Sequence, residues 1–384
     1  MVIIAIMRYI LPHVLKDLQR KMVFIGGPRQ VGKTTLARYI LEKHFKSGRY
    51  FNWDFDEDRT AILKKRWRED DKLLVFDEIH KFPKWKQWFK GIYDVLGDKH
   101  RILITGSARL DVYRRGGDSL LGRYHYWRLH PFTLDELPIS IDKGHALEKL
   151  MTIGGFPEPL LTGNETETRR WRRERFDRVI REDIRDLEGV RDIQMLRLLL
   201  DLLRERVGSP IVISNIARDL QVAHKTVKMW IQVLERMYLI FVVRPYVKSS
   251  PRSILKPPKI YFFDNGDVKG DEGACFENLV ASSLLKRLHF LEDSEGYEFD
   301  LYYIRDKEGR EVDFAIVKDG VLQEIIEAKY SDENISRGLK YYSQKLRPTK
   351  ATQIVATLKN SFDEKGVRVM SPFEYFGHPL WNAN

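Results

Sequence analysis

The 384-residue chain carries 66 Lys and Arg against 55 Asp and Glu, giving a formal net charge of +11. This excess favours an acidic partner, with nucleic acid ahead of an anionic membrane, and a charge-rich solubilising surface is the alternative. The single cysteine, Cys275, excludes an internal disulfide and a zinc site of several cysteines. No stretch approaches the ~20 apolar residues of a membrane span. The apolar run 1–6 is too short for a signal sequence, so we expect no membrane association and a cytoplasmic location.

A glycine-rich loop at 27–35 is the most specific pattern in the chain. It fits G-x-x-x-x-G-K-[ST] and stands between an apolar, strand-like run at 22–26 and a helix-prone run at 35–42. Phosphates need backbone N–H groups at close range, where a Cβ would collide. We predict that this loop binds ATP, with Lys33 at the β- and γ-phosphates and Thr34 on Mg²⁺. The predicted nucleotide-binding residues are Gly27, Pro28, Arg29, Gln30, Val31, Gly32, Lys33, Thr34 and Thr35.

The run 72–78 ends in two acidic residues, Asp77 and Glu78. Its apolar residues are continuous, as expected of a parallel strand buried on both faces. Acids at the carboxyl end of such a strand face the crevice in which ligands bind. We predict that Asp77 holds Mg²⁺ and that Glu78 polarises the attacking water.

Another apolar run, 101–105, ends in Thr105 and is followed by Gly106 and Ser107. A polar side chain at the tip of this strand can contact the γ-phosphate or position water, and Ser107 or Thr105 fits that role. Arg123 stands where an arginine finger would reach the nucleotide of a neighbouring subunit and neutralise charge on the γ-phosphate. A surface arginine or a structural ion pair is an equal alternative, and the first role would require a homo-oligomer.

These motifs resemble the AAA+ class of P-loop ATPases. They are similar, more closely, to a widespread archaeal and bacterial family of AAA+-like ATP-binding proteins, near the signalling ATPases in which a winged helix follows the ATPase. The resemblance implies ATP hydrolysis with Mg²⁺. The segments that carry it are 27–35, 74–81, 102–107, 121–123, 131–137 and 154–157.

Residues 136–205 have a helical pattern that we interpret as a lid. Its stretch 168–187 is dense in arginine, which is compatible with a nucleic-acid stripe. Acids interleave with the arginines, and the pairs Glu174–Arg178 and Asp177–Arg181 have helical spacing, so a solvated, salt-bridged helix is favoured. The arginines are Arg169, Arg170, Arg172, Arg173, Arg175, Arg178, Arg181 and Arg185.

The stretch 213–234 predicts a helix-turn-helix. Ser214 is suited to cap the first helix, and the second places three apolar residues on one face. Runs 239–243 and 259–264 predict two strands around a basic loop, so the whole resembles a winged helix that binds DNA or, alternatively, packs against protein. The basic loop contains Lys248, Arg252, Lys256 and Lys259. The predicted DNA contacts are Lys225, Thr226, Lys228, Lys248 and Arg252.

The last third resembles the PD-(D/E)XK nuclease superfamily. The alternating runs 311–317 and 321–328 predict strands that carry Asp313, Glu327 and Lys329, and Glu277 matches an upstream helical acid. Two carboxylates of this kind can hold a divalent ion that activates water. An ordinary α/β domain used for assembly is the alternative.

The hairpin register sets a condition on this candidate nuclease site. A strict two-residue turn at Asp319-Gly320 would pair Asp313 with Ile326 and turn its side chain away from Glu327. The site therefore requires a three-residue loop or a β-bulge near Asp313.

The fold class we expect is α/β. It comprises an AAA+ P-loop ATPase core (1–135), a helical lid (136–205), a winged helix (206–260) and a restriction-endonuclease-like domain (261–384). The favoured function is an ATPase that acts on DNA or is regulated by it. The alternatives are a signalling switch whose C-terminal half binds a protein partner, and an ATP-gated, metal-dependent DNA nuclease.

Overall fold

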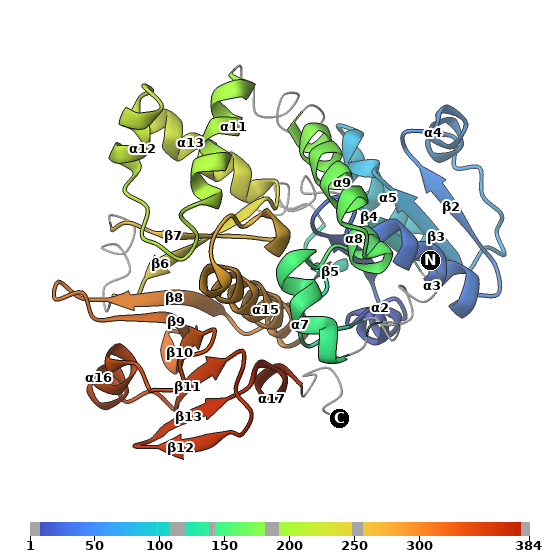
Figure 1. The fold of residues 1–384 in the computed structure, drawn as a ribbon. Coiled ribbons are helices and arrows are strands. Elements are labelled where there is room, and N and C mark those ends of the chain that lie inside the picture. The colour runs from blue at the N-terminus through green and yellow to red at the C-terminus, as the bar shows by residue number, and fades with distance from the viewer. Residues whose placement is uncertain are drawn as a thin grey trace. The chain divides into compact units, whose positions relative to one another are not determined.

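The computed structural model divides the chain into two compact units. The first runs to Pro131 and takes in 138–140, whereas the second comprises 132–137 and the chain from Ile141 onward (Figure 1). The structure describes residues 8–97, 99–106, 120–137, 141, 143–180, 192–247 and 256–377.

The first unit is built on a five-stranded parallel sheet of order β2-β3-β4-β1-β5. The strands predicted before the P-loop and before the two acids are therefore present, and their carboxyl ends share one edge. The elements are α2 (Leu11–Asp17), β1 (Met22–Gly26), α3 (Lys33–His44), β2 (Gly48–Asn52), α4 (Asp56–Leu63), β3 (Leu73–Asp77), η1 (Ile79–Lys81), α5 (Trp85–Leu96), β4 (Arg101–Thr105) and β5 (Tyr124–Arg128).

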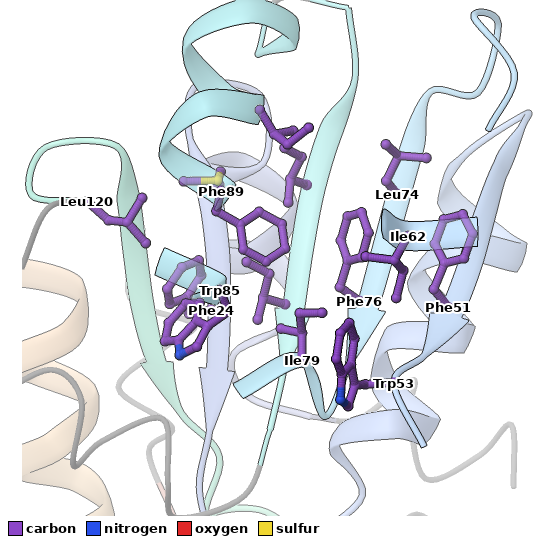
Figure 2. Packing of buried hydrophobic residues seen from close by; sticks show 14 of the residues in the cluster. Phe24, Phe51, Trp53, Ile62, Leu74, Phe76, Ile79, Trp85, Phe89 and Leu120 are labelled. Carbon is purple, nitrogen blue, oxygen red and sulfur yellow. The ribbon is translucent and has the colours of Figure 1, made fainter. Parts of the chain in front are cut away.

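An aromatic cluster fills the core between this sheet and α5. Phe76 of β3 stacks on Phe51 of β2 at 5.4 Å between ring centroids and meets Phe89 of α5 edge-on at 5.1 Å. Figure 2 shows these rings between the strands and the helix. Because aromatic side chains bury large apolar areas, the cluster fixes β3 and β2, the strands that carry Asp77 and Tyr50.

The second unit contains an eight-stranded mixed sheet of order β12-β13-β11-β10-β9-β8-β6-β7. The sheet is preceded by helices, among them the helix-turn-helix pair α12 and α13. The elements are α7 (Lys143–Thr152), α8 (Pro157–Thr162), α9 (Glu165–Arg178), α11 (Ile193–Arg204), α12 (Ile213–Asp219), α13 (His224–Arg236), β6 (Ile240–Pro245), β7 (Lys259–Phe262), η3 (Asn265–Asp267), α15 (Glu272–Glu295), β8 (Phe299–Arg305), β9 (Glu311–Lys318), β10 (Val321–Lys329), α16 (Arg337–Leu346), β11 (Lys350–Val355), β12 (Phe362–Glu364), β13 (Val367–Met370) and α17 (Pro372–Phe376).

Two details of the helix-turn-helix region differ from expectation. Helix α12 begins at Ile213 after Val212, so Ser214 lies inside the first turn and does not cap it. Lys259, which we placed both in the basic loop and at the start of the strand 259–264, begins β7 as the strand prediction requires, but it is fully buried and does not belong to an exposed loop. Strands β6 and β7 pair with each other, as predicted, but β6 also pairs in parallel with β8 through Arg244 and Pro245.

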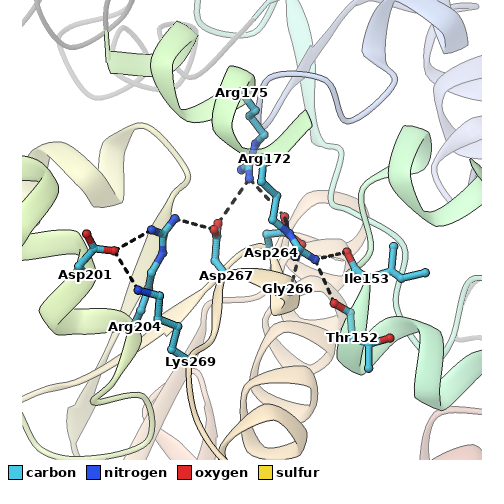
Figure 3. Close-up of polar contacts among 10 residues, drawn as sticks. All are labelled: Thr152, Ile153, Arg172, Arg175, Asp201, Arg204, Asp264, Gly266, Asp267 and Lys269. Atoms are coloured by element: carbon cyan, nitrogen blue, oxygen red, sulfur yellow. Dashed lines mark hydrogen bonds and ion pairs between the residues drawn. The ribbon is translucent and has the colours of Figure 1, made fainter. Parts of the chain in front are cut away.

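The arginine-rich helix α9 is only partly a solvated helix. Arg169 forms an exposed pair with Glu165, and Asp177 pairs with Arg197. Two other arginines point inward, toward carboxylates of the η3 region (Figure 3). Arg181 and Arg185 lie outside the described residues.

Those inward arginines join α9 to two acids of the η3 region. Arg175 is 4% exposed, and its guanidinium lies 3.5 Å from Asp264 and 3.7 Å from Asp267. Arg172 donates to the backbone carbonyls of Thr152 and Ile153 (Figure 3). Because these charges are buried and mutually paired, they belong to the interior of the unit.

Candidate functional site

The loop between β1 and α3 has the backbone geometry that phosphate binding needs. Gly27 and Gly32 have φ of 134° and 99°, values that side chains with a Cβ disfavour. A Cβ on Gly27 would also lie 2.3 Å from the carbonyl oxygen of Leu129. Lys33 begins the helix, and its Nζ donates to the carbonyls of Gly27 and Pro28 at 2.9 and 2.5 Å. The lysine ammonium is therefore held against the loop.

Three hydroxyl groups converge on Asp77 at the end of β3. Thr34 and Tyr50 donate to Oδ2 at 2.7 and 2.6 Å, and Thr105 donates to Oδ1 at 2.5 Å. The parallel register explains the meeting, since Asp77 pairs with Asn52 on one side and with Thr105 on the other. The predicted partners Thr34 and Asp77 are thus brought together.

Glu78 follows directly in a left-handed conformation with φ of 57°. Burial and the neighbouring Asp77 raise its pKa, although Lys33, Lys81 and Arg29 act in the opposite direction. Its carboxylate lies 3.7 Å from Lys81. A carboxylate with a raised pKa is a stronger proton acceptor, which is the chemistry expected of a water-polarising residue.

The sequence did not reveal two residues of this site. Tyr50 lies in the middle of β2, among residues with no distinctive pattern. Burial and Asp77 raise the pKa of its phenol. Arg8 donates from a buried guanidinium to the carbonyls of Val31 and His130, which fixes the loop to the chain that follows β5. Both contacts join distant segments, so no local motif carries them.

The remaining predictions for the ATPase core have different outcomes. Ser107 lies outside the described residues. Thr105, the alternative to it, is buried and bonded to Asp77. Arg123 pairs with Asp94 at 2.7 Å, and this mutual bond lowers the pKa of the aspartate. Its role as an arginine finger stays a prediction.

In the helix-turn-helix, the exposed side of α13 carries the predicted contacts. Lys225 and Lys228 are exposed and Thr226 is partly buried, whereas Val227 on the opposite side is fully buried. Lys248 and Arg252 lie outside the described residues. The first turn of α13 contains no acidic residue that could pair with Lys225 or Lys228.

A buried ion cluster occupies the predicted nuclease-like region. The ammonium of Lys259 lies 2.6 Å from Glu311, 3.1 Å from Glu277 and 3.2 Å from Asp313. Burial would lower the pKa of Lys259, but Tyr261 and the three acids outweigh this and hold it well above its usual value. Glu277 and Asp313 therefore meet, as predicted, but around Lys259, which we did not predict to be part of this cluster.

The β9–β10 hairpin contains a register shift of the kind predicted, but the shift is not near Asp313, where we expected a bulge. The turn is the two-residue pair Asp319-Gly320, and the register shifts between Leu322 and Glu324, so that Ile326 pairs with Phe314. The bulge thus lies near the turn, and Glu327 follows opposite Asp313. In agreement, the amide of Ala328 donates to Asp313 at 3.0 Å.

Glu327 and Lys329 form the other part of the predicted nuclease-like set. They pair at 2.9 Å between Oε1 and Nζ. Burial and Asp313 raise the pKa of Glu327 to about 8. Among the residues described, no group of three or more His, Cys, Asp or Glu side chains is arranged to hold a metal ion.

The comparisons with known proteins divide the chain into three matched segments. Residues 19–138 match a family model described as an AAA domain. Residues 144–268 and 272–375 match two domains of unknown function, designated DUF8612 and DUF4143.

Two similar proteins carry the description uncharacterized. One from Methanocaldococcus jannaschii is 24% identical over 382 residues, covering 88% of this chain and 82% of that protein. One from Mycobacterium tuberculosis is 25% identical over 305 residues, covering 73% of this chain and 67% of that protein.

A solved structure of the Thermotoga maritima RuvB Holliday junction branch migration motor is also similar. It is 19% identical with a TM-score of 0.31, covering 60% of this chain and 86% of that chain. This score is too low to establish a shared overall fold or function. In the parts of the chain that are described, no helix is both long and apolar enough to span a bilayer. The AAA match and the parallel-sheet geometry support a P-loop ATPase core in residues 19–138.

Proposed function

We propose that the protein binds and hydrolyses ATP and that its nucleotide state regulates a DNA-binding second unit. The observation that carries the ATPase assignment is the convergence of Thr34 and Asp77, 2.7 Å apart, beside the loop that holds Lys33. A hydroxyl and a carboxylate oxygen at this separation are suitable Mg²⁺ ligands, since Mg²⁺ prefers oxygen donors.

Each residue of the proposed site has a distinct role. Bound Mg²⁺ would neutralise charge on the phosphate oxygens. Lys33 supplies a second positive charge, and Thr34 and Asp77 are positioned to hold the ion. Glu78 orients and deprotonates the attacking water, and Thr105 keeps the Asp77 carboxylate in place through its 2.5 Å bond.

The ATPase proposal is tested with Lys33→Ala and Glu78→Gln. Lys33→Ala should lose ATP binding, whereas Glu78→Gln should bind ATP but hydrolyse it at least ~100-fold more slowly. Binding is measured with a fluorescent ATP analogue and turnover by phosphate release. Unchanged ATP hydrolysis by Lys33→Ala would contradict the proposal that this loop is the site of ATP hydrolysis.

The DNA-binding part of the proposal rests on the exposed cations of α13 and on the positive net charge of the chain. ATPase rate should rise with added duplex or single-stranded DNA at low salt and lose this stimulation at moderate salt. Lys225→Ala/Lys228→Ala should reduce DNA affinity and the salt slope together. Lys307→Ala/Lys365→Ala, which alters two exposed lysines outside the helix-turn-helix, is the charge-matched control.

A signalling switch is the second candidate. It predicts no DNA stimulation and an ATP-dependent change of oligomer size, measured by light scattering. Arg123→Ala would then abolish ATP turnover only in the assembled form, since an arginine finger acts in a neighbouring subunit.

A further inference from the structure

We propose that the ammonium of Lys259 takes the place of a divalent cation in the carboxylate cluster of the C-terminal sheet, so that this domain does not cleave nucleic acid by metal-dependent hydrolysis. The proposal does not depend on the ATPase or on DNA binding.

The position of Lys259 carries the argument. It begins β7, is fully buried, and lies within 3.2 Å of oxygens from Glu277, Glu311 and Asp313. These acids come from α15 and β9, so one ammonium neutralises carboxylates of two elements. A buried charge of this kind is retained only when it is paired.

The carboxylates also have protein donors of their own. Arg305 donates to the second oxygen of Glu311 at 2.6 Å, and the amide of Ala328 donates to the second oxygen of Asp313 at 3.0 Å. Tyr261 donates to Glu277 at 2.6 Å. A divalent ion needs several oxygen ligands with free lone pairs.

Glu327, the remaining predicted ligand, is engaged by Lys329 at 2.9 Å through one oxygen. Its other oxygen is buried and has no hydrogen-bond partner among the described residues. The three neighbouring carboxylates are already paired with Lys259. The single remaining oxygen of Glu327 does not make a divalent-cation site by itself. The arrangement therefore fits an internal ammonium better than a bound metal.

The test is Mn²⁺ binding to the nucleotide-free full chain, counted from the electron paramagnetic resonance signal of free Mn²⁺. Wild type and Asp313→Asn should bind equal numbers of ions. Lys259→Met should bind one ion more than wild type, because removal of the positive charge about 3 Å from the carboxylates leaves them without a cation. The gain should disappear in Lys259→Met/Asp313→Asn. Asp77→Asn identifies any ion held at the P-loop.

An ion that wild type binds and Asp313→Asn loses, with both proteins folded by circular dichroism, would overturn the proposal. So would Mn²⁺-dependent plasmid cleavage by wild type that disappears in Asp313→Asn. Should Lys259→Met fail to fold, this comparison of wild type with Asp313→Asn still decides.

Discussion

Replacing Arg175 by methionine should destabilise the second unit, because the substitution leaves two buried aspartates without their central cation. Arg175 is 4% exposed and Asp264 is 0% exposed, and their charged groups lie 3.5 Å apart (Figure 3). Its guanidinium also lies 3.8 Å from the ring centroid of Phe156, a contact that methionine would keep only in part.

The magnitude follows from what remains after the substitution. Removing one partner of a buried ion pair costs about 3–5 kcal/mol. Arg204 still donates to Asp267 at 2.7 Å, and Arg172 still lies 3.8 Å from Asp264. Because both aspartates keep one cationic neighbour, we expect the free energy of unfolding to fall by the lower end of this range, about 3 kcal/mol.

The assay is urea denaturation followed by circular dichroism, with hydrogen exchange of α9 peptides to locate the loss. Arg169→Met is the matched control on the same helix, since Arg169 and its partner Glu165 are 64% and 87% exposed. The control should change the free energy of unfolding by less than about 0.5 kcal/mol. Equal losses in the two variants would refute the reasoning that burial makes the Arg175 pair essential.

Three further outcomes are expected. Gly27→Ala should lose ATP affinity, since the new Cβ would lie 2.3 Å from a backbone oxygen. The control Gly122→Ala also changes a glycine with positive φ, but open space surrounds it, so ATP affinity should be kept. Equal ATP affinities in the two variants would contradict this reasoning. Because burial and the adjacent aspartate raise the pKa of Glu78, acidification should slow hydrolysis already above pH 4.5, and a rate that stays flat down to that pH would count against this. Burial and its acidic neighbour raise the pKa of Asp264 from 3.8 to about 6, so its contribution to stability is full below about pH 4 and is lost as pH rises through about 6. The stability of wild type relative to Asp264→Asn should fall across that window, measured by urea denaturation at several pH values, and a constant difference would refute the shift.

The sequence predicted those parts of the site whose residues are neighbours in the chain. The P-loop and the pair Asp77-Glu78 each lie within one short segment, so the strand–loop–helix context can be recognised from the sequence alone. The need for an irregularity in the hairpin was predictable for a different reason, although its position near the turn was not. The two-residue period of a strand made the strict register incompatible with Asp313 and Glu327 on one face, and the structure contains a shift.

The parts that escaped prediction depend on contacts between distant segments. Arg8 bonds to a carbonyl 122 residues away, and Tyr50 reaches Asp77 across 27 positions. Lys259 was predicted to begin a strand, but its basic neighbours gave no sign that strand pairing would bury it against three carboxylates. Arg175 was similarly concealed among exposed arginines, because helical spacing does not show which face is covered.

The continuity of β6 with β8 bears on how this protein can be dissected. A fragment ending at residue 260 would divide β7 and remove the acids that neutralise Lys259. It would also leave the edge of β6 with unpaired backbone groups, which promote aggregation. Recombinant studies of the helix-turn-helix should therefore use the chain from Ile141 to Gly377 together with the preceding segment 132–137. That segment belongs to the same unit, because the Phe132 amide donates to the carbonyl of Gly155 and Glu136 pairs with Lys286. A shorter fragment that unfolds would therefore not test the proposed DNA binding.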